Sequence, residues 1–258
     1  MIKKKEIKKE NILGYDVCTL TIIECVHLIF STINNKQKKY LACFNPHSFA
    51  ISLKDLLFAE SLREAAILVP DGVGIVLGSR ILGGKIKKRI TGSDIFYELS
   101  DYINAKEGFK VFFLGSSDIT LNKVIEKYKL DYPNIEIAGS LSPPFVDEFT
   151  IEENKNMVQY INICKPDILW IAMTAPKQEK WIYNNIEILN VRFAAGIGAV
   201  FDFYCGNVNR NNILLTNIGL EWFSRLIQEP KRLWKRTFIS APIFIYYILK
   251  SKVIKTLY

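Results

Sequence analysis

The chain has few of the residues that build a metal centre or a disulfide framework. Its 258 residues include two histidines, His27 and His47, and five cysteines, none of which form a CxxC pair. A zinc site needs a denser set of ligands, and scattered cysteines in odd number are typical of reduced thiols in the cytosol. We therefore expect a cytoplasmic protein without a structural metal or a disulfide.

Long hydrophobic runs are also scarce. The opening "MIKKKEIKKENIL" is charged and lacks the apolar stretch of a signal peptide. The longest uncharged run near the C-terminus, Thr237 to Leu249, has 13 residues, whereas a membrane-spanning helix needs about 20. We therefore expect no segment that crosses a bilayer.

What the sequence does have is a large apolar fraction and an uneven charge. Hydrophobic residues make up 49% of the chain, enough for a sizeable core. Of the net charge of +8, residues 220–258 carry +6 and the rest only +2. Such a local excess favours an anionic partner, and phosphate, anionic lipid and nucleic acid all fit it.

Short apolar runs alternate with longer helical patterns along the chain. The predicted strands are 40–44, 66–69, 110–114, 135–138, 168–172 and 191–195. The predicted helices are 19–34, 53–64, 74–82, 94–104, 117–131, 151–164 and 178–190. This alternation predicts an α/β fold, with a Rossmann-like, mostly parallel sheet and helices on both of its faces.

The C-terminal part departs from that alternation. From about Leu220, aromatic, aliphatic and basic residues are combined in two helical patterns separated by Pro230. A short, basic, aromatic-rich helix is typical of a membrane interface, and packing on the sheet or on another subunit is the alternative. We predict a catalytic core over 1–219 and a basic helical appendage over 220–258.

Polar clusters follow four of the predicted strands: "FNPHS", "PDGVG", "GSS" and "TAPKQE". Ligands of open α/β sheets bind beyond the carboxyl ends of the strands. Each cluster also has a simpler interpretation, since Asn45 or His47 can cap a helix and Asp71 in Pro-Asp-Gly is a common turn residue. The "GVG" at 72–74 lacks the further glycine of a dinucleotide-binding fingerprint.

Taken in order, seven segments resemble one known family. They are "NPHSF", "VPDGVGIV", "KKRITGSD", "VFFLGSS", "APKQEKWI", "GIGAVFDFYCG" and "GLEWFSRLIQEPKRLWKR". This series, from about residue 11 into the tail, resembles the WecG/TagA/CpsF family of bacterial glycosyltransferases (glycosyltransferase family 26). The resemblance implies metal-independent, inverting transfer from a UDP-sugar to a polyprenyl-diphosphate-linked saccharide at the inner face of the cell membrane. The products of such enzymes feed teichoic acid, common antigen, capsule or exopolysaccharide.

The resemblance also implies roles for individual residues. Asp71 matches the proposed general base, which takes the proton of the acceptor hydroxyl. Arg89 and Gln178 match polar positions of the catalytic pocket, and Asn45 matches a position near the sugar and diphosphate. Substrate contacts are further expected from Gly115, Asp202, Arg225, Arg232 and Arg236. Arginine suits the leaving UDP because its planar fork donates two hydrogen bonds to phosphate.

Three further positions depart from the family pattern or allow two interpretations. Cys43 stands where many members have threonine, and a thiol is a poorer hydrogen-bonding group. Arg210 is retained, but the two residues after it differ from the usual "RAP". His47 either begins a helix or contacts the acceptor.

The sequence leaves the substrates and two other function classes open. The donor could be UDP-N-acetylmannosamine, its uronic acid, UDP-glucuronate or another UDP-hexose, and no cofactor or metal is expected. A homo-oligomer is possible, and nucleic acid is not an expected partner. The alternatives are a nicotinamide-dependent oxidoreductase on a similar sheet and a non-catalytic basic protein that binds membranes.

Overall fold

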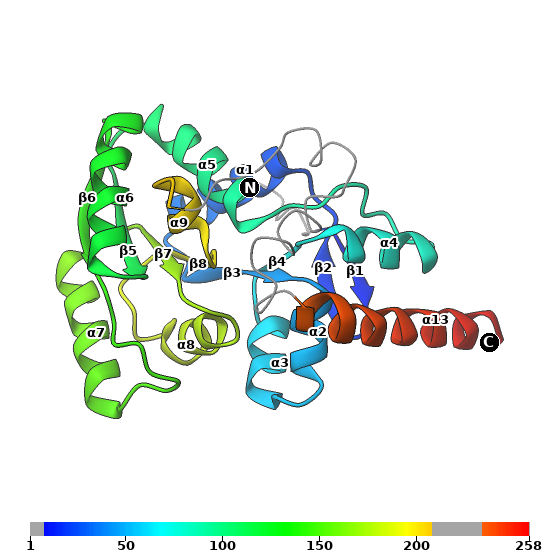
Figure 1. The fold of residues 1–258 in the computed structure, drawn as a ribbon. Coiled ribbons are helices and arrows are strands. Elements are labelled where there is room, and N and C mark those ends of the chain that lie inside the picture. Colours follow the sequence, from blue (N-terminus) through cyan, green and yellow to red (C-terminus); the bar gives the residue numbers. More distant parts are fainter. Residues whose placement is uncertain (1–7, 208–233, 258) are drawn as a thin grey trace.

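A computed structural model describes residues 8–207 and 234–257. Its centre is a six-stranded sheet in the order β4-β3-β8-β7-β5-β6, in which every neighbouring pair is parallel (Figure 1). The strands are β3 (Lys39–Phe44), β4 (Ile67–Pro70), β5 (Phe109–Gly115), β6 (Ile135–Leu141), β7 (Ile168–Ala172) and β8 (Phe193–Gly196). The predicted parallel sheet is therefore confirmed.

Helices cover both faces of the sheet because its strands are apolar on both sides. In β5, Val111 and Phe113 point into one core, and Phe112 and Leu114 into the other. The first core is closed by α1 (Ile22–Asn34), α5 (Gly92–Asn104), α6 (Asp118–Asp131) and α9 (Val200–Tyr204). The second is closed by α2 (Pro46–Ser52), α3 (Leu56–Arg63), α4 (Val73–Ile81), α7 (Ile151–Cys164), α8 (Lys177–Asn185) and α13 (Ala241–Leu257).

The structure adds a hairpin and the short helices α2 and α9, which the sequence patterns did not predict. An antiparallel hairpin, β1 (Lys9–Ile12) and β2 (Tyr15–Cys18), precedes α1, which begins at Ile22 rather than at Thr19. The helix predicted over 53–64 is found as α3, which begins after its N-cap Asp55, whereas α2 before it was not predicted. Helix α2 is only seven residues long, which is too short for a clear amphipathic period.

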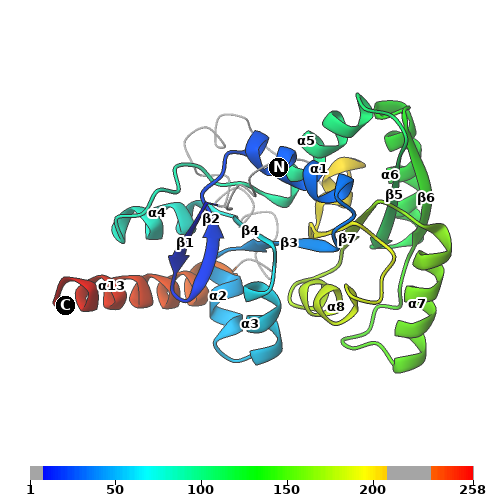
Figure 2. The ribbon, with the colours of Figure 1, turned by 180° about the vertical axis from the view of Figure 1, so that it is seen from behind.

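The C-terminal helix lies against the core rather than apart from it. Phe244 and Ile248 of α13 are buried in the second core, and both views place α13 beside α4 (Figures 1 and 2). A π-helical turn over Arg236–Ser240 leads into α13, where Pro242 lacks the N–H that a regular helix would use. This packing carries the C-terminal segment to the end of the sheet where α2 and α4 begin.

The same segment bears on one expectation about membranes. The helical stretch Arg236–Ile254 is 19 residues long, and by length and composition alone it could cross a bilayer. The stretch contains Arg236, Lys250 and Lys252, so the uncharged run on which the expectation rested is still the 13 residues from Thr237 to Leu249. Only 17% of this stretch is buried in the structure, so most of its apolar surface faces outward.

Candidate active site

Two polar side chains emerge side by side where β3 and β4 end. The strands pair in register, with Phe44 opposite Pro70, so Asn45 and Asp71 are the next residues on neighbouring strands. The backbone N–H of Asp71 donates to the carbonyl of Phe44 at 2.8 Å. Nδ2 of Asn45 lies 3.4 Å from Oδ2 of Asp71. Both residues are half-buried.

Local sequence explains why these two residues are held there. Asn45 caps α2, and its Oδ1 accepts from the N–H groups of His47 and Ser48 at 3.0 and 2.9 Å. Pro46 at the first helical position suits this cap because it has no N–H to satisfy. Gly72 has a φ of +94°, a conformation that favours glycine, and α4 begins directly after it. The cap and turn interpretations are thus correct, and they place Asn45 next to Asp71.

Cys43 and His47 lie on either side of Asn45. Sγ of Cys43 lies 3.7 Å from the carbonyl oxygen of Gly196, and burial, followed by the nearby Asp71 carboxylate, raises the pKa of the Cys43 thiol. Nδ1 of His47 lies 2.8 Å from Oγ of Ser240. Burial and then Arg236 lower the pKa of His47 to about 4, so this imidazole is neutral near pH 7. His47 therefore contacts the C-terminal segment.

The first turn of α8, which follows β7, adds a buried pair, Gln178 and Glu179. Their exposed fractions are 3% and 2%. Oε1 of Gln178 accepts from the N–H groups of Met173 and Gly198 at 3.3 and 3.1 Å, and Nε2 donates to Oε1 of Glu179 at 2.8 Å. Gln178 therefore ties the loops after β7 and β8 together at the edge where Asp71 lies.

The remaining predicted residues in the described ranges occupy different places. Arg89 is half-buried in the loop after α4, and its neighbour Ile90 donates to the carbonyl of Pro70 at 2.9 Å, which brings the loop past the end of β4. Gly115 ends β5 with a φ of +111°, and a Cβ there would lie 2.3 Å from the Ala172 carbonyl oxygen. Asp202 is half-buried on α9.

The predicted arginines of the appendage fall into two groups. Arg210, Arg225 and Arg232 lie outside the described residues. Arg236 lies in the π-helical turn, where its charge acts on His47 and on Glu179. The C-terminal segment thus brings one cationic side chain to the edge of the sheet that carries Asp71.

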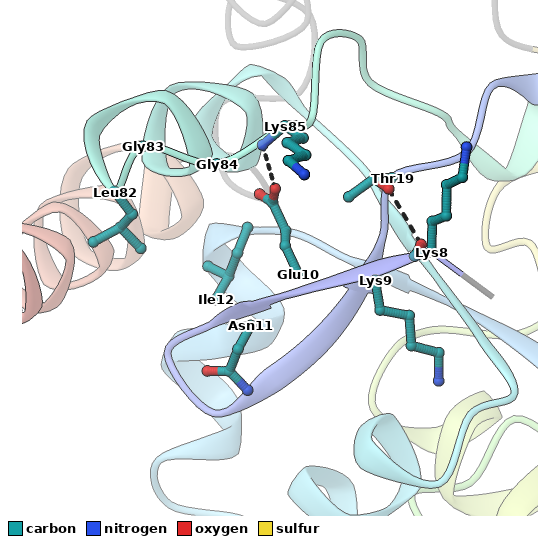
Figure 3. Close-up of a pocket in the computed structure, with 10 residues that line it drawn as sticks. All are labelled: Lys8, Lys9, Glu10, Asn11, Ile12, Thr19, Leu82, Gly83, Gly84 and Lys85. Atoms are coloured by element: carbon teal, nitrogen blue, oxygen red, sulfur yellow. Dashed lines mark hydrogen bonds between the residues drawn. The ribbon is translucent and has the colours of Figure 1, made fainter. Parts of the chain in front are cut away.

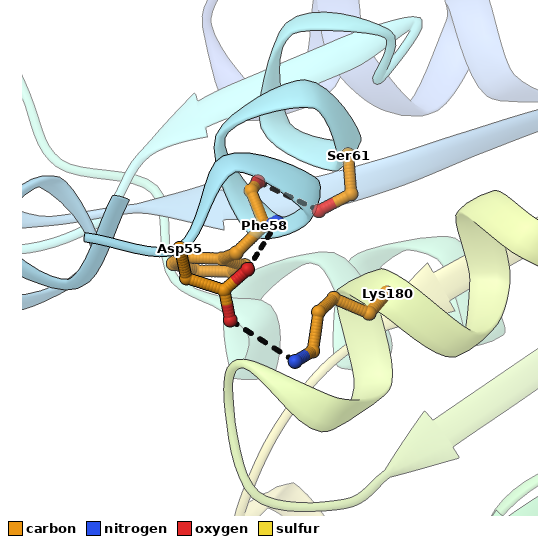
Figure 4. Close-up of polar contacts among 4 residues, drawn as sticks. All are labelled: Asp55, Phe58, Ser61 and Lys180. Carbon is orange, nitrogen blue, oxygen red and sulfur yellow. Dashed lines mark hydrogen bonds and ion pairs between the residues drawn. The ribbon is translucent and has the colours of Figure 1, made fainter. Parts of the chain in front are cut away.

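An ion pair holds α8 against α3 beside this edge. Nζ of Lys180 lies 3.0 Å from Oδ2 of Asp55, and Oδ1 of Asp55 accepts from the N–H of Phe58 at 2.9 Å (Figure 4). Oγ of Ser61 donates to the Phe58 carbonyl one turn along, at 2.8 Å. Asp55 therefore caps α3 and fixes α8, the helix that begins with Gln178 in its first turn.

A separate cleft lies between the hairpin and the end of α4. It is lined by Lys8, Lys9, Glu10, Asn11, Ile12, Thr19, Leu82, Gly83, Gly84 and Lys85. Glu10 accepts from the backbone N–H of Lys85 there, which ties the hairpin to the loop that leads to Arg89 (Figure 3). This cleft contains none of the predicted site residues.

The sequence patterns missed two residues of this region, Glu179 and Ser240. The sequence pattern could have indicated that Glu179 is buried. Glu179, Ile182 and Ile186 follow the spacing of one helix face, and both isoleucines are buried. Ser240 had no such signal, because its role depends on α13 docking beside α2. Within residues 8–207 and 234–257 no cluster of three or more His, Cys, Asp or Glu residues is arranged to hold a metal ion.

Comparison with known proteins relates most of this chain to one family. Residues 10–257 match the model of the glycosyl transferase WecG/TagA/CpsF family. The chain is 33% identical, over 85% of its own length and 82% of the relative, to N-acetylglucosaminyldiphosphoundecaprenol N-acetyl-beta-D-mannosaminyltransferase of Bacillus subtilis (strain 168). A protein of the same name from Staphylococcus aureus (strain MW2) is 27% identical over 97% of this chain and 96% of its own. With the family model matched over most of its length, this chain belongs to the glycosyl transferase WecG/TagA/CpsF family.

Proposed function

We propose that the protein transfers N-acetylmannosamine from UDP-N-acetylmannosamine to N-acetylglucosamine linked to a polyprenyl diphosphate. The observation that carries the proposal is the half-buried carboxylate of Asp71, held beside Asn45 at the open edge of a parallel sheet. The choice of sugar and acceptor follows the names of the relatives from Bacillus subtilis and Staphylococcus aureus. Family membership supplies the reaction class.

Asp71 acts as the general base of an inverting displacement. The acceptor hydroxyl loses its proton to a carboxylate oxygen of Asp71 while its oxygen forms a bond to the anomeric carbon. The bond between that carbon and the β-phosphate oxygen breaks, and its electron pair leaves with UDP. Asn45 supports this step because its Nδ2 group lies within 3.4 Å of Oδ2 and orients the carboxylate.

The departing UDP gains negative charge, which cationic side chains offset. Arg236 already acts on the site through its charge, and Arg89 lies on the loop that passes the end of β4. In our proposal these arginines do the work that a metal ion does in other transferases. No cofactor other than the donor takes part.

The exposed side of the C-terminal helix supports a position at the inner face of the cell membrane. Large apolar side chains are exposed on the π-helical turn and α13: Phe238, Ile239, Ile245, Tyr246, Leu249, Val253 and Ile254. Lys250 and Lys252 lie among them, as expected of a helix at an anionic lipid surface. Helix α4, packed beside α13, adds the exposed side chains of Val73, Leu77 and Ile81.

Vesicle binding tests this position. The double variant Ile245→Ser/Leu249→Ser should bind phosphatidylglycerol vesicles at least tenfold more weakly than the wild type in co-sedimentation. The matched control is Ile119→Ser/Leu130→Ser on α6, whose two residues are also exposed. Equal loss in both variants, or no binding by the wild type, would contradict the membrane assignment. Self-association through the same face would appear instead as a dimer in sedimentation velocity.

The donor panel tests the reaction itself. UDP-N-acetylmannosamine, UDP-N-acetylglucosamine and UDP-glucuronate are each offered with a synthetic N-acetylglucosaminyl diphospholipid, and the product is analysed by mass spectrometry and NMR. We expect transfer from the first donor and a β-linked product, since inversion of an α-linked donor gives that anomer. Transfer from another donor would mean that the proposed donor sugar is wrong. Binding of NAD(H) without binding of UDP would contradict the proposed transferase and favour a nicotinamide-dependent oxidoreductase.

A further inference from the structure

We propose that Glu179 is a positioning residue: its carboxyl group holds the side-chain amide of Gln178 and thereby fixes the two loops that form the floor of the site. The expected effect on transfer rests on the proposed function. The effect on the loops can be measured without any substrate.

The hydrogen bonds around Gln178 place Glu179 in control of its orientation. The amide oxygen of Gln178 accepts from Met173, which follows β7, and from Gly198, which follows β8. The amide nitrogen donates to Oε1 of Glu179 at 2.8 Å. A side-chain amide has one acceptor oxygen and one donor group, and a carboxyl oxygen that carries no proton only accepts, which holds for Oε1 of Glu179 whether the group is ionised or protonated on Oε2. Glu179 therefore favours the rotamer in which the oxygen faces both loop amides.

The position of Gln178 is transmitted toward Asp71 through β8 and β3. A Cβ on Gly196 would lie 3.1 Å from Nε2 of Gln178, so β8 and the amide are in close contact. The carbonyl of Gly196 lies 3.7 Å from the thiol of Cys43 on β3. Phe44, the next residue, accepts the backbone N–H of Asp71 at 2.8 Å. A displacement of Gln178 would therefore reach Asp71, the proposed base, through the packed residues of β8 and β3.

Glu179 is itself held in an unusual state. Its Oε2 is buried without a hydrogen-bond partner among the described residues, and an unpaired buried polar atom is costly. Burial raises the pKa of Glu179 to about 7, while the hydrogen bond from Gln178 and the charge of Arg236 act in the opposite direction. The charge of Glu179 in turn helps to raise the pKa of Tyr40 and of Cys43 on β3.

Two variants of similar size separate the hydrogen bond from packing. Glu179→Gln keeps an oxygen that accepts from Gln178, whereas Glu179→Met fills the space without one. Amide hydrogen exchange of Met173 and Gly198 is then measured by NMR on the full chain without ligands. We expect exchange at least tenfold faster in Glu179→Met and close to the wild-type rate in Glu179→Gln. Wild-type exchange of both amides in Glu179→Met would overturn the proposal.

Transfer kinetics give the second reading. We expect kcat to fall at least tenfold in Glu179→Met, with a smaller loss in Glu179→Gln, and Glu187→Gln at the exposed end of the same region serves as control. In the double variant Gln178→Ala/Glu179→Met the losses should not add, because both residues act through one contact. Equal kcat losses in the Gln and Met variants would show packing alone. If the wild type transfers no sugar, the proposed function fails, and amide exchange still decides the role of Glu179.

Discussion

Two carboxyl groups near the same edge of the sheet, those of Asp71 and Glu179, differ in how deeply they are buried. Asp71 is half-buried at the end of β4, with Asn45 beside its carboxylate. Glu179 is 2% exposed behind the loops after β7 and β8, where one of its oxygens has no partner among the described residues. Accessibility suits Asp71 to proton transfer with a substrate. Burial suits Glu179 to holding other groups in place.

The largest expected effect on stability concerns the cost of burying Glu179. Its pKa in the folded protein is about 7, above the ordinary 4.5, so the folded state binds more protons than the unfolded state between these values. The contribution of this proton to the free energy of unfolding is fully present below pH 4.5 and is lost as the pH rises through 7. Between pH 5 and pH 8, Glu179→Gln should therefore lose about 2.5 kcal/mol less unfolding free energy than the wild type.

Urea denaturation at both pH values measures this difference, since all other titrating groups are shared by the two proteins. The matched control is Glu187→Gln, which removes an exposed carboxyl group from the same part of the chain. Parallel pH dependence in the wild type and Glu179→Gln would mean that Glu179 is not the buried titrating group described above.

A smaller effect separates the cap from the active-site role of Asn45. Asn45→Ala removes an N-cap, which should cost about 1 kcal/mol of unfolding free energy, and it should lower kcat about tenfold because Asp71 loses its neighbour. Thr150→Ala removes the comparable cap of α7. It should cost similar stability and leave kcat unchanged. Equal kcat in both variants would remove Asn45 from the reaction.

The smallest effect tests how firmly α8 is held. Lys180→Met breaks the pair with Asp55, whose side chains are 25% and 28% exposed, and should cost at most about 1 kcal/mol. Lys110→Met breaks the more exposed pair with Glu136 and should cost less. Thermal denaturation of both variants ranks the two pairs. A larger loss for Lys110 would contradict the ranking by exposure.

Local patterns predicted the sheet and the position of Asp71 well. Strands such as 168–172 are apolar throughout, and the helix over 151–164 has a clear boundary at each end, so both matched the structure. The first hairpin was missed because its turn, with Leu13 and Gly14 both at positive φ, uses leucine in a conformation that favours glycine or asparagine. The residue types of this turn therefore did not indicate a hairpin.

Contacts between distant segments could not be read from local patterns. Ser240 meets His47 across almost the whole chain, and this depends on Phe244 and Ile248 packing into the second core. Gln178 was predicted as a pocket residue from the resemblance, yet its 3% exposure and its three hydrogen bonds follow from the pairing of β7 with β8. That geometry exists only in the assembled sheet.

The central claim, that Asp71 is the base, is tested most directly by Asp71→Asn. Asparagine keeps the shape of the side chain and an oxygen that accepts from Asn45, but it is a far weaker base. We measure the single-turnover rate of transfer from UDP-N-acetylmannosamine and, by calorimetry, the affinity for UDP. The account predicts a rate lower by about a thousandfold with almost unchanged UDP affinity. Transfer near the wild-type rate would contradict it.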